Sequence, residues 1–234
     1  MSVLNENTII GASAAGGYDI PNSLRFNDDD SAYLSRTPSV ASNRKTWTWS
    51  GWVKRGNLST EQNILTGWVD ANNWTEIYFR NSDQVTFRHY SSGIIFEGVT
   101  TALQRDASAW YHIIVVADTT QATAADRVKM YVNGTDQAIT VNSGAYPSLN
   151  LDLDISSASL HTIGQRSSGG YLDGYLAEVN FIDGQALTPD SFGETGTYGE
   201  WKPIAYAGTY GTNGFYLPFK QDYTVEGFST VTYE

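Results

Sequence analysis

Residues 46–53 read Thr-Trp-Thr-Trp-Ser-Gly-Trp-Val, a pattern that indicates the fold class. Trp47, Trp49, Gly51 and Val53 share one face of an extended strand, because successive side chains in a strand point to opposite faces. Aromatic and branched side chains repeating with a period of two residues are typical of a strand that lies on a hydrophobic core. The stretch therefore predicts a core strand of a β-sheet.

The same pattern continues on both sides of this strand. Trp110–Ala117 is apolar on both faces, which predicts a central strand that is covered on both sides. Val128–Val132 ends at Asn133-Gly134, a strong hairpin signal. Further short strands are predicted at 24–26, 64–69, 75–80, 85–90, 160–163 and 175–181, and one helical turn at 188–190. No long helical period is present, so we predict an all-β, two-sheet antiparallel jelly-roll sandwich with an extended N-terminal arm.

The composition excludes several classes of function. The net charge of −11 disfavours binding to nucleic acid or to an anionic membrane surface, both of which need a basic face. The chain has no cysteine, which excludes disulfides, thiolate metal sites and a cysteine nucleophile. The sequence has no transmembrane run, so we expect no membrane insertion.

Residues 1–22 differ from the remainder of the chain. They combine small residues, a Gly-Gly pair and almost no charge. We expect an extended arm that attaches the domain to another protein through Leu4, Ile9, Ile10 and Tyr18. The alternatives are a disordered tail and a strand that adds to the domain's own sheet.

The polar loop between Trp68 and Trp74 is a candidate glycan site. Aromatic rings stack on the apolar face of a sugar, while groups such as the Asp70 carboxylate and the Asn72 amide bond its hydroxyls. The alternative is that both indoles pack in the sandwich, since large aromatic side chains usually belong to cores.

No catalytic residue is expected. Glycan hydrolysis needs two carboxylates flanking the scissile bond, and an E-x-D-x-E strand motif would supply them on one face. The sequence lacks that motif: Asp152 and Asp154 have no third partner, and the spacing of Glu178 and Asp183 places them on opposite faces. The three histidines, at positions 89, 112 and 161, lack metal-ligand spacing, and we expect them to be structural.

Four segments together resemble the laminin-G-like, concanavalin A-like jelly roll. They are Leu24–Asn27 with Asp30 and Tyr33-Leu34; Trp49–Val53; Trp110–Val115 with Lys129–Gly134; and Ile163–Gln165 with Gly174–Val179 and Ala186–Thr188. The resemblance implies a jelly-roll domain over residues 23–200. The remaining residues, 201–234, are expected to supply a C-terminal strand and a tail. Two alternatives stay open: the tail leads to a further domain, or the module ends in an extended tail.

A structural calcium ion is the candidate cofactor that this resemblance implies. Related jelly rolls pin an early strand to a late one with calcium, and Asp30 with Asp173 or Glu178 would be its ligands here. The alternative is a solvated acidic turn, because no complete set of oxygen ligands is visible. No other cofactor is expected.

A narrower resemblance is to laminin-G-like modules of bacteriophage virion proteins. It is carried by Ser23–Asn27, Ala32–Arg36, Trp49–Arg55 and Gly211–Leu217. It implies a non-enzymatic virion protein that is assembled in the host cytoplasm, in a tail fibre, spike or capsid-surface appendage, as a homo-oligomer. Its body would either bind host-surface glycan or only build a rigid appendage. The alternative is a secreted bacterial carbohydrate-binding module or glycan hydrolase.

Overall fold

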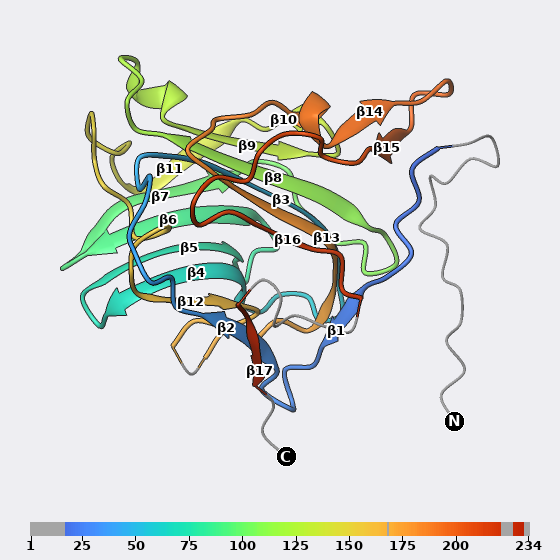
Figure 1. The fold of residues 1–234 in the computed structure, drawn as a ribbon, viewed down its shortest axis with the longest axis horizontal. Helices are drawn as coiled ribbons and strands as arrows, with labels where there is room; N and C mark the ends of the chain where they lie inside the picture. The colour runs from blue at the N-terminus through green and yellow to red at the C-terminus, as the bar shows by residue number, and fades with distance from the viewer. Residues whose placement is uncertain (1–16, 168, 221–226, 232–234) are drawn as a thin grey trace.

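The computed structural model describes residues 17–167, 169–220 and 227–231, and two large antiparallel β-sheets lie face to face in it (Figure 1). The predicted all-β, two-sheet sandwich is therefore confirmed. The described part of the chain has no helix long and apolar enough to cross a membrane. It has two short 3-10 helices, η1 (Ala124–Asp126) and η2 (Pro189–Ser191), and η2 overlaps the helical turn predicted at 188–190.

The first sheet, called sheet A, is built around the strand predicted from residues 46–53. Its order is β1 (Leu24–Phe26), β13 (Gly174–Asp183), β3 (Thr46–Arg55), β8 (Tyr111–Asp118), β9 (Val128–Val132) and β10 (Thr135–Asp136), with β16 (Phe215–Leu217) also paired to β13. A small separate sheet pairs β14 (Gly193–Thr195) with β15 (Trp201–Pro203).

The second sheet, called sheet B, carries the longest run of hairpins. Its order is β11 (Ile139–Gly144), β7 (Ile94–Thr100), β6 (Val85–Ser91), β5 (Asn73–Phe79), β4 (Gln62–Asp70), β12 (Leu160–Ile163), β2 (Tyr33–Arg36) and β17 (Ser229–Val231). Strands β4 to β7 follow one another both in the chain and in the sheet, so their registers are set by local turns.

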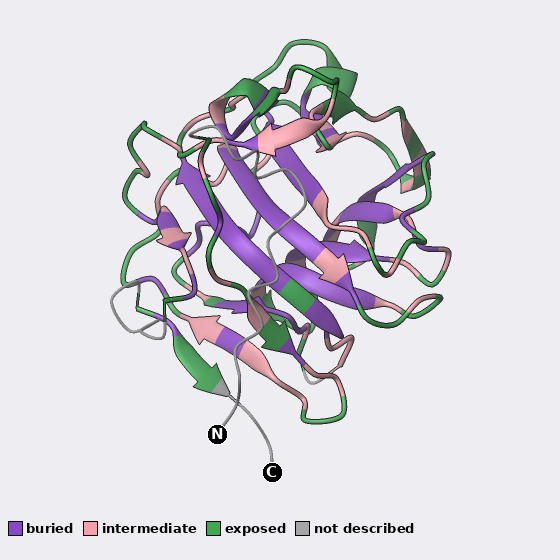
Figure 2. Ribbon diagram, turned by 90° about the vertical axis from the view of Figure 1, so that its right-hand side faces the viewer, coloured by how far each residue is buried: buried purple, intermediate pink, exposed green. Residues whose placement is uncertain are grey.

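The core lies between the two sheets and contains the predicted face of β3. Trp47, Trp49 and Val53 are fully buried there. The packing of Trp49 requires a glycine at position 51, because a methyl group there would lie 2.7 Å from the Trp49 indole. Figure 2, viewed from the side of sheet A, shows the long central strands of this sheet as buried.

The outer face of sheet A is covered by the protein itself. Ile114 and Val116 of β8 pack there against Ile182 and Phe192, which confirms the prediction that this strand is covered on both faces. Nearer β1, Ile20 packs on Trp52 and Ala177 of the same face. Sheet A therefore contacts apolar side chains on both sides.

The end of the N-terminal arm lies on this outer face of sheet A. Tyr18 donates a 2.5 Å hydrogen bond to Glu178, and its hydroxyl lies 3.2 Å from that of Tyr216. Tyr18 therefore contacts its own domain, although residues 17–22 form no strand. The other expected attachment residues, Leu4, Ile9 and Ile10, lie outside the described residues.

The sandwich also extends past residue 200. Strand β16 pairs with β13 in sheet A, and β17 pairs with β2 at the edge of sheet B. Residues 201–217 and 229–231 thus supply strands to the same domain that residues 23–200 begin.

Candidate functional site

The outer face of sheet B carries a row of five large apolar side chains, one from each of five adjacent strands. Direct cross-strand pairs connect its members in the order Leu160, Trp68, Trp74, Tyr90 and Ile94. Directly paired residues point to the same face, and strands lie about 4.8 Å apart, so this apolar row extends for about 19 Å across the sheet. Its end residues, Leu160 and Ile94, are 39% and 37% exposed.

The three aromatic rings of the apolar row stack on one another. The centroids of Trp68 and Trp74 lie 5.3 Å apart at 24°, and those of Trp74 and Tyr90 lie 3.9 Å apart at 13°. Trp74 is therefore the middle ring, with an aromatic neighbour on each face. A sugar can stack only at the ends of this group, on Trp68 or Tyr90, or contact the ring edges.

A second row, called the polar row, runs beside the apolar one. Cross-strand pairs connect its members in the order Thr162, Thr66, Glu76, Arg88 and Glu97. Thr162, Thr66, Glu76 and Arg88 each lie two positions along their strands from a member of the apolar row, which places them on the same face. Glu97 lies three positions from Ile94, across a register shift, and its direct pairing with Arg88 places it on this face as well. An apolar strip thus lies next to a strip of hydroxyl, carboxylate and guanidinium groups.

Glu76 lies at the centre of the polar row and is fully buried. Its Oε1 accepts hydrogen bonds from Arg88 Nε at 2.6 Å, from Arg166 Nη1 at 3.2 Å and from Trp74 Nε1 at 3.3 Å. Burial raises the pKa of Glu76, and the charges of the two arginines oppose that rise. The contact with Trp74 connects the polar row to the aromatic stack.

The four residues predicted for a glycan site lie together at one end of sheet B. Trp68 and Trp74 pair across the β4–β5 hairpin, where Asp70 is the last residue of β4 and Asn72 lies in the turn. The Asp70 carboxylate accepts the Asn72 backbone N–H at 2.7 Å and the Asn73 amide at 3.0 Å, so it stabilises the turn.

Sequence reasoning missed Tyr90 and the whole polar row. The signal was present, because the predicted strands 75–80 and 85–90 are joined by a short turn that sets their register. That register pairs Trp74 with Tyr90 and Glu76 with Arg88. Arg166 carried no such signal, since it comes from the segment between β12 and β13 and reaches Glu76 across 90 positions.

The three expected calcium ligands each have protein partners in this structure. Asp30 accepts a hydrogen bond from Asn27, Asp173 forms an ion pair with Arg25 at 2.5 Å, and Glu178 accepts hydrogen bonds from two tyrosines. Among the described residues, no three histidine or acidic side chains are grouped so that they could hold a metal ion.

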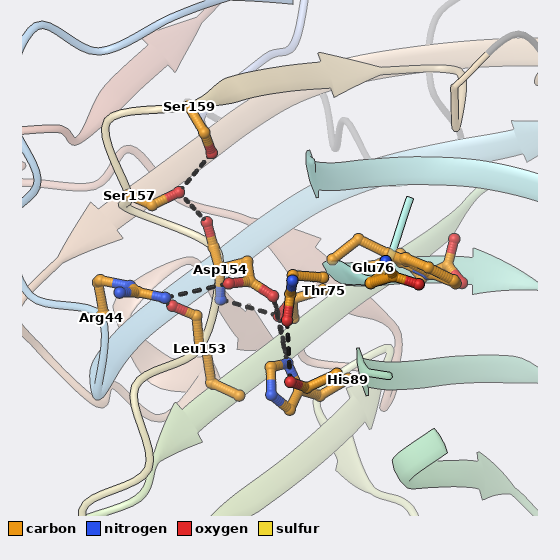
Figure 3. Close-up of polar contacts among 12 residues, drawn as sticks. Arg44, Thr75, Glu76, His89, Leu153, Asp154, Ser157 and Ser159 are labelled. Carbon is orange, nitrogen blue, oxygen red and sulfur yellow. Dashed lines mark hydrogen bonds and ion pairs between the residues drawn. The ribbon is translucent and has the colours of Figure 1, made fainter. Parts of the chain in front are cut away.

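A buried polar cluster lies between the sheets, where Arg44, Thr75, His89 and Asp154 converge (Figure 3). Thr75 Oγ1 is 2.8 Å and Asp154 Oδ2 is 3.5 Å from the same nitrogen, Nδ1 of His89. A catalytic triad instead places the hydroxyl and the carboxylate on opposite ring nitrogens. Burial, with a smaller contribution from Arg44, lowers the pKa of His89 to about 4. The geometry is that of a structural network.

Comparison with known families adds the decisive observation. Residues 26–191 match a laminin G family model described as the concanavalin A-like lectin/glucanases superfamily. The chain belongs to this superfamily. No curated protein matches the sequence.

Solved structures share the fold of this superfamily member at low sequence identity. The native heptameric SAP-like pentraxin from Limulus polyphemus is 16% identical, with a TM-score of 0.52 over 93% of this chain and 98% of that one. The CBM40 domain of the Ruminococcus gnavus IT-sialidase, bound to α2,3 sialyllactose, is 13% identical, with a TM-score of 0.51 over 72% of this chain and 93% of that one.

Proposed function

We propose that this protein is a non-catalytic glycan-binding domain whose binding surface is the outer face of sheet B. One observation carries the proposal: the partly exposed aromatic rings of the apolar row lie directly beside the partly exposed guanidinium groups of Arg88 and Arg166 on the outer face of sheet B. A sugar presents both an apolar ring face and hydroxyl groups, and a site that recognises it needs both kinds of surface side by side. The carbohydrate-binding CBM40 domain with the same fold supports the proposal.

Substitution at the end of the aromatic stack tests this function. We expect Tyr90→Ala to weaken binding to a glycan identified on an array by about tenfold, because the ring supplies a stacking surface worth about 1–1.5 kcal/mol. Tyr198→Ala is the matched control, since Tyr198 is 94% exposed in the β14–β15 hairpin, away from sheet B. Equal affinities for both variants, measured by calorimetry, would refute the proposed surface.

We further propose that the domain belongs to a bacteriophage virion appendage, as its resemblance to virion modules suggests. The arm would attach it to the particle, and the heptameric pentraxin with the same fold supports assembly as a homo-oligomer. Deleting residues 1–16 is the suitable test, because Tyr18 and Ile20 pack on the domain itself. We expect loss of particle incorporation with the folded domain intact, and normal incorporation would contradict the proposal.

The rival function is a secreted carbohydrate-binding or hydrolytic module. Release of reducing sugar from a panel of polysaccharides would establish the hydrolase. Glycan binding without such release, by a protein that is found in purified particles, would favour the virion module.

A further inference from the structure

Three arginine side chains gather on the face of sheet B that carries the two rows. Arg80, Arg88 and Arg166 have side chains that are 27%, 13% and 28% exposed, whereas Glu76 and Glu97 beneath them are 0% and 6% exposed. A ligand on this face therefore meets guanidinium groups before it meets those two carboxylates.

We propose that the site takes an acidic saccharide, one that carries a carboxylate or a sulfate, and that Arg166 and Arg88 pair with its anionic group. This inference rests on the proposed glycan-binding function and names the class of its ligand. Guanidinium groups present a planar set of donors that matches carboxylate and sulfate-like oxyanions, and such charge-assisted hydrogen bonds are about twice as strong as neutral ones.

Arg166 lies where it can bind the anionic group of a ligand whose sugar ring contacts the aromatic stack. Its guanidinium carbon lies 5.9 Å from the centre of the Trp74 ring, so the charge sits beside the aromatic stack. Its ion pairs with Glu61 and Glu76 both use Nη1. Because a guanidinium has five N–H donors, these two contacts leave donors for a ligand.

Glu61 competes with an incoming anion for the same arginines. Its carboxylate lies 3.2 Å from Arg166 Nη1 and 3.8 Å from Arg88 Nη2, and its side chain is 37% exposed. An acidic ligand would displace this carboxylate from the guanidinium groups. Removing the charge of Glu61 should therefore strengthen binding of an acidic saccharide.

The net charge of −11 does not oppose such a ligand at short range. At physiological ionic strength the Debye length is about 8 Å, so carboxylates elsewhere on the surface are largely screened at this face. Local pairing then dominates, and the affinity should fall as salt is raised.

Two variants with opposite expected effects test the proposal. For a sialylated, uronic or sulfated oligosaccharide, we expect Arg166→Gln to weaken binding about tenfold or more and Glu61→Gln to strengthen it severalfold. Glu61→Gln should leave the affinity for the matching neutral oligosaccharide nearly unchanged, and Arg166→Gln should weaken binding of the neutral oligosaccharide far less than binding of the acidic one. Arg105→Gln is the control, because Arg105 is 60% exposed and pairs with Asp83 instead.

Calorimetry measures the affinity of each variant for the acidic oligosaccharide and for its neutral partner. The melting temperature shows that each variant is folded. Tighter binding of the neutral partner, or a Glu61→Gln variant that does not gain affinity, would overturn the acidic-ligand proposal. If neutral glycans bind and Tyr90→Ala lowers their affinity, the proposed glycan-binding function stands even when the acidic-ligand proposal fails. Failure of every glycan to bind would overturn both.

Discussion

At the scale of single residues, His112 shows how a buried polar side chain is satisfied. It is 1% exposed on the outer face of sheet A, with its ring stacked 4.9 Å from that of Trp52. Trp201 Nε1 donates to His112 Nδ1 at 2.8 Å, so the ring proton lies on Nε2, which donates to Ser50 Oγ at 2.8 Å. Both ring nitrogens therefore have partners, and the imidazole is held neutral.

Trp201→Phe tests this arrangement. The variant keeps most of the ring but removes the N–H that satisfies His112 Nδ1, leaving a buried acceptor without its donor. We expect a loss of about 1–3 kcal/mol in the free energy of unfolding, measured by urea denaturation. A loss below about 0.5 kcal/mol would show that the hydrogen bond contributes little.

The stability of the protein should also depend on pH through this residue. Burial lowers the pKa of His112 to about 3, whereas the unfolded chain titrates near 6.5. The unfolded state thus binds the proton first, and the contribution of His112 is complete above pH 6.5 and is lost as the pH falls toward 3. Below pH 6.5 the titration of His112 should lower the free energy of unfolding by up to about 1.4 kcal/mol for each pH unit.

The comparison that isolates the effect is between the wild type and His112→Gln. We expect the difference in their free energies of unfolding to shrink between pH 7 and pH 5. A difference that stays constant over this range would show that His112 is not held neutral.

At the scale of elements, β13 connects three neighbouring strands of sheet A. It pairs with β1, β3 and β16, and its register shifts between Ala177 and Asn180. The shift includes Glu178, whose φ of 49° is unusual for a residue with a side chain. This irregularity turns the Glu178 carboxylate toward Tyr18 and Tyr216 on the outer face.

Gly174, the first residue of β13, should tolerate no side chain. Its φ is 149°, and a methyl group there would lie 2.1 Å from the backbone oxygen of Lys54. We expect Gly174→Ala to lower the free energy of unfolding by about 1–3 kcal/mol or more, because backbone strain adds to the clash. Gly17→Ala is the matched control, since nothing lies within 4 Å of its added methyl group. Similar melting temperatures for the two variants would contradict this account.

At the scale of the whole molecule, the two outer faces of the sandwich differ. Sheet A is covered by residues 17–22 and by segments that follow β13, whereas sheet B exposes the two ends of its apolar row. The end of the arm and the proposed glycan surface therefore lie on opposite sides of the molecule (Figure 1). An arm attached on one side would leave the binding surface directed away from the point of attachment.

Two truncations test whether the end of the arm belongs to the domain. Deleting residues 1–20 should lower the free energy of unfolding by about 2–3 kcal/mol relative to deleting residues 1–16. The longer deletion removes Ile20, which is 8% exposed, and one of the hydroxyls bonded to Glu178. Equal stabilities, compared by urea denaturation, would mean that residues 17–20 do not support the fold.

The candidate site was only partly predictable. The Trp68–Trp74 hairpin could be read from the sequence because its two strands are joined by a short turn. Arg166 and Leu160 could not, because β12 and the segment after it reach β4 and β5 from about 90 residues along the chain. The residues expected to bind calcium show the same limit, because no local pattern indicates the partners that Asp173 and Glu178 have in the structure.

The sandwich class, the core face of β3 and the two covered faces of β8 follow from the sequence alone, because a period of two residues is a local property of a strand. The covered outer face, the position of the end of the arm and the charged partners of Glu76 are known only from the three-dimensional structure. Those features depend on contacts between segments far apart in the chain, where pairing and packing rather than local periodicity select the neighbours.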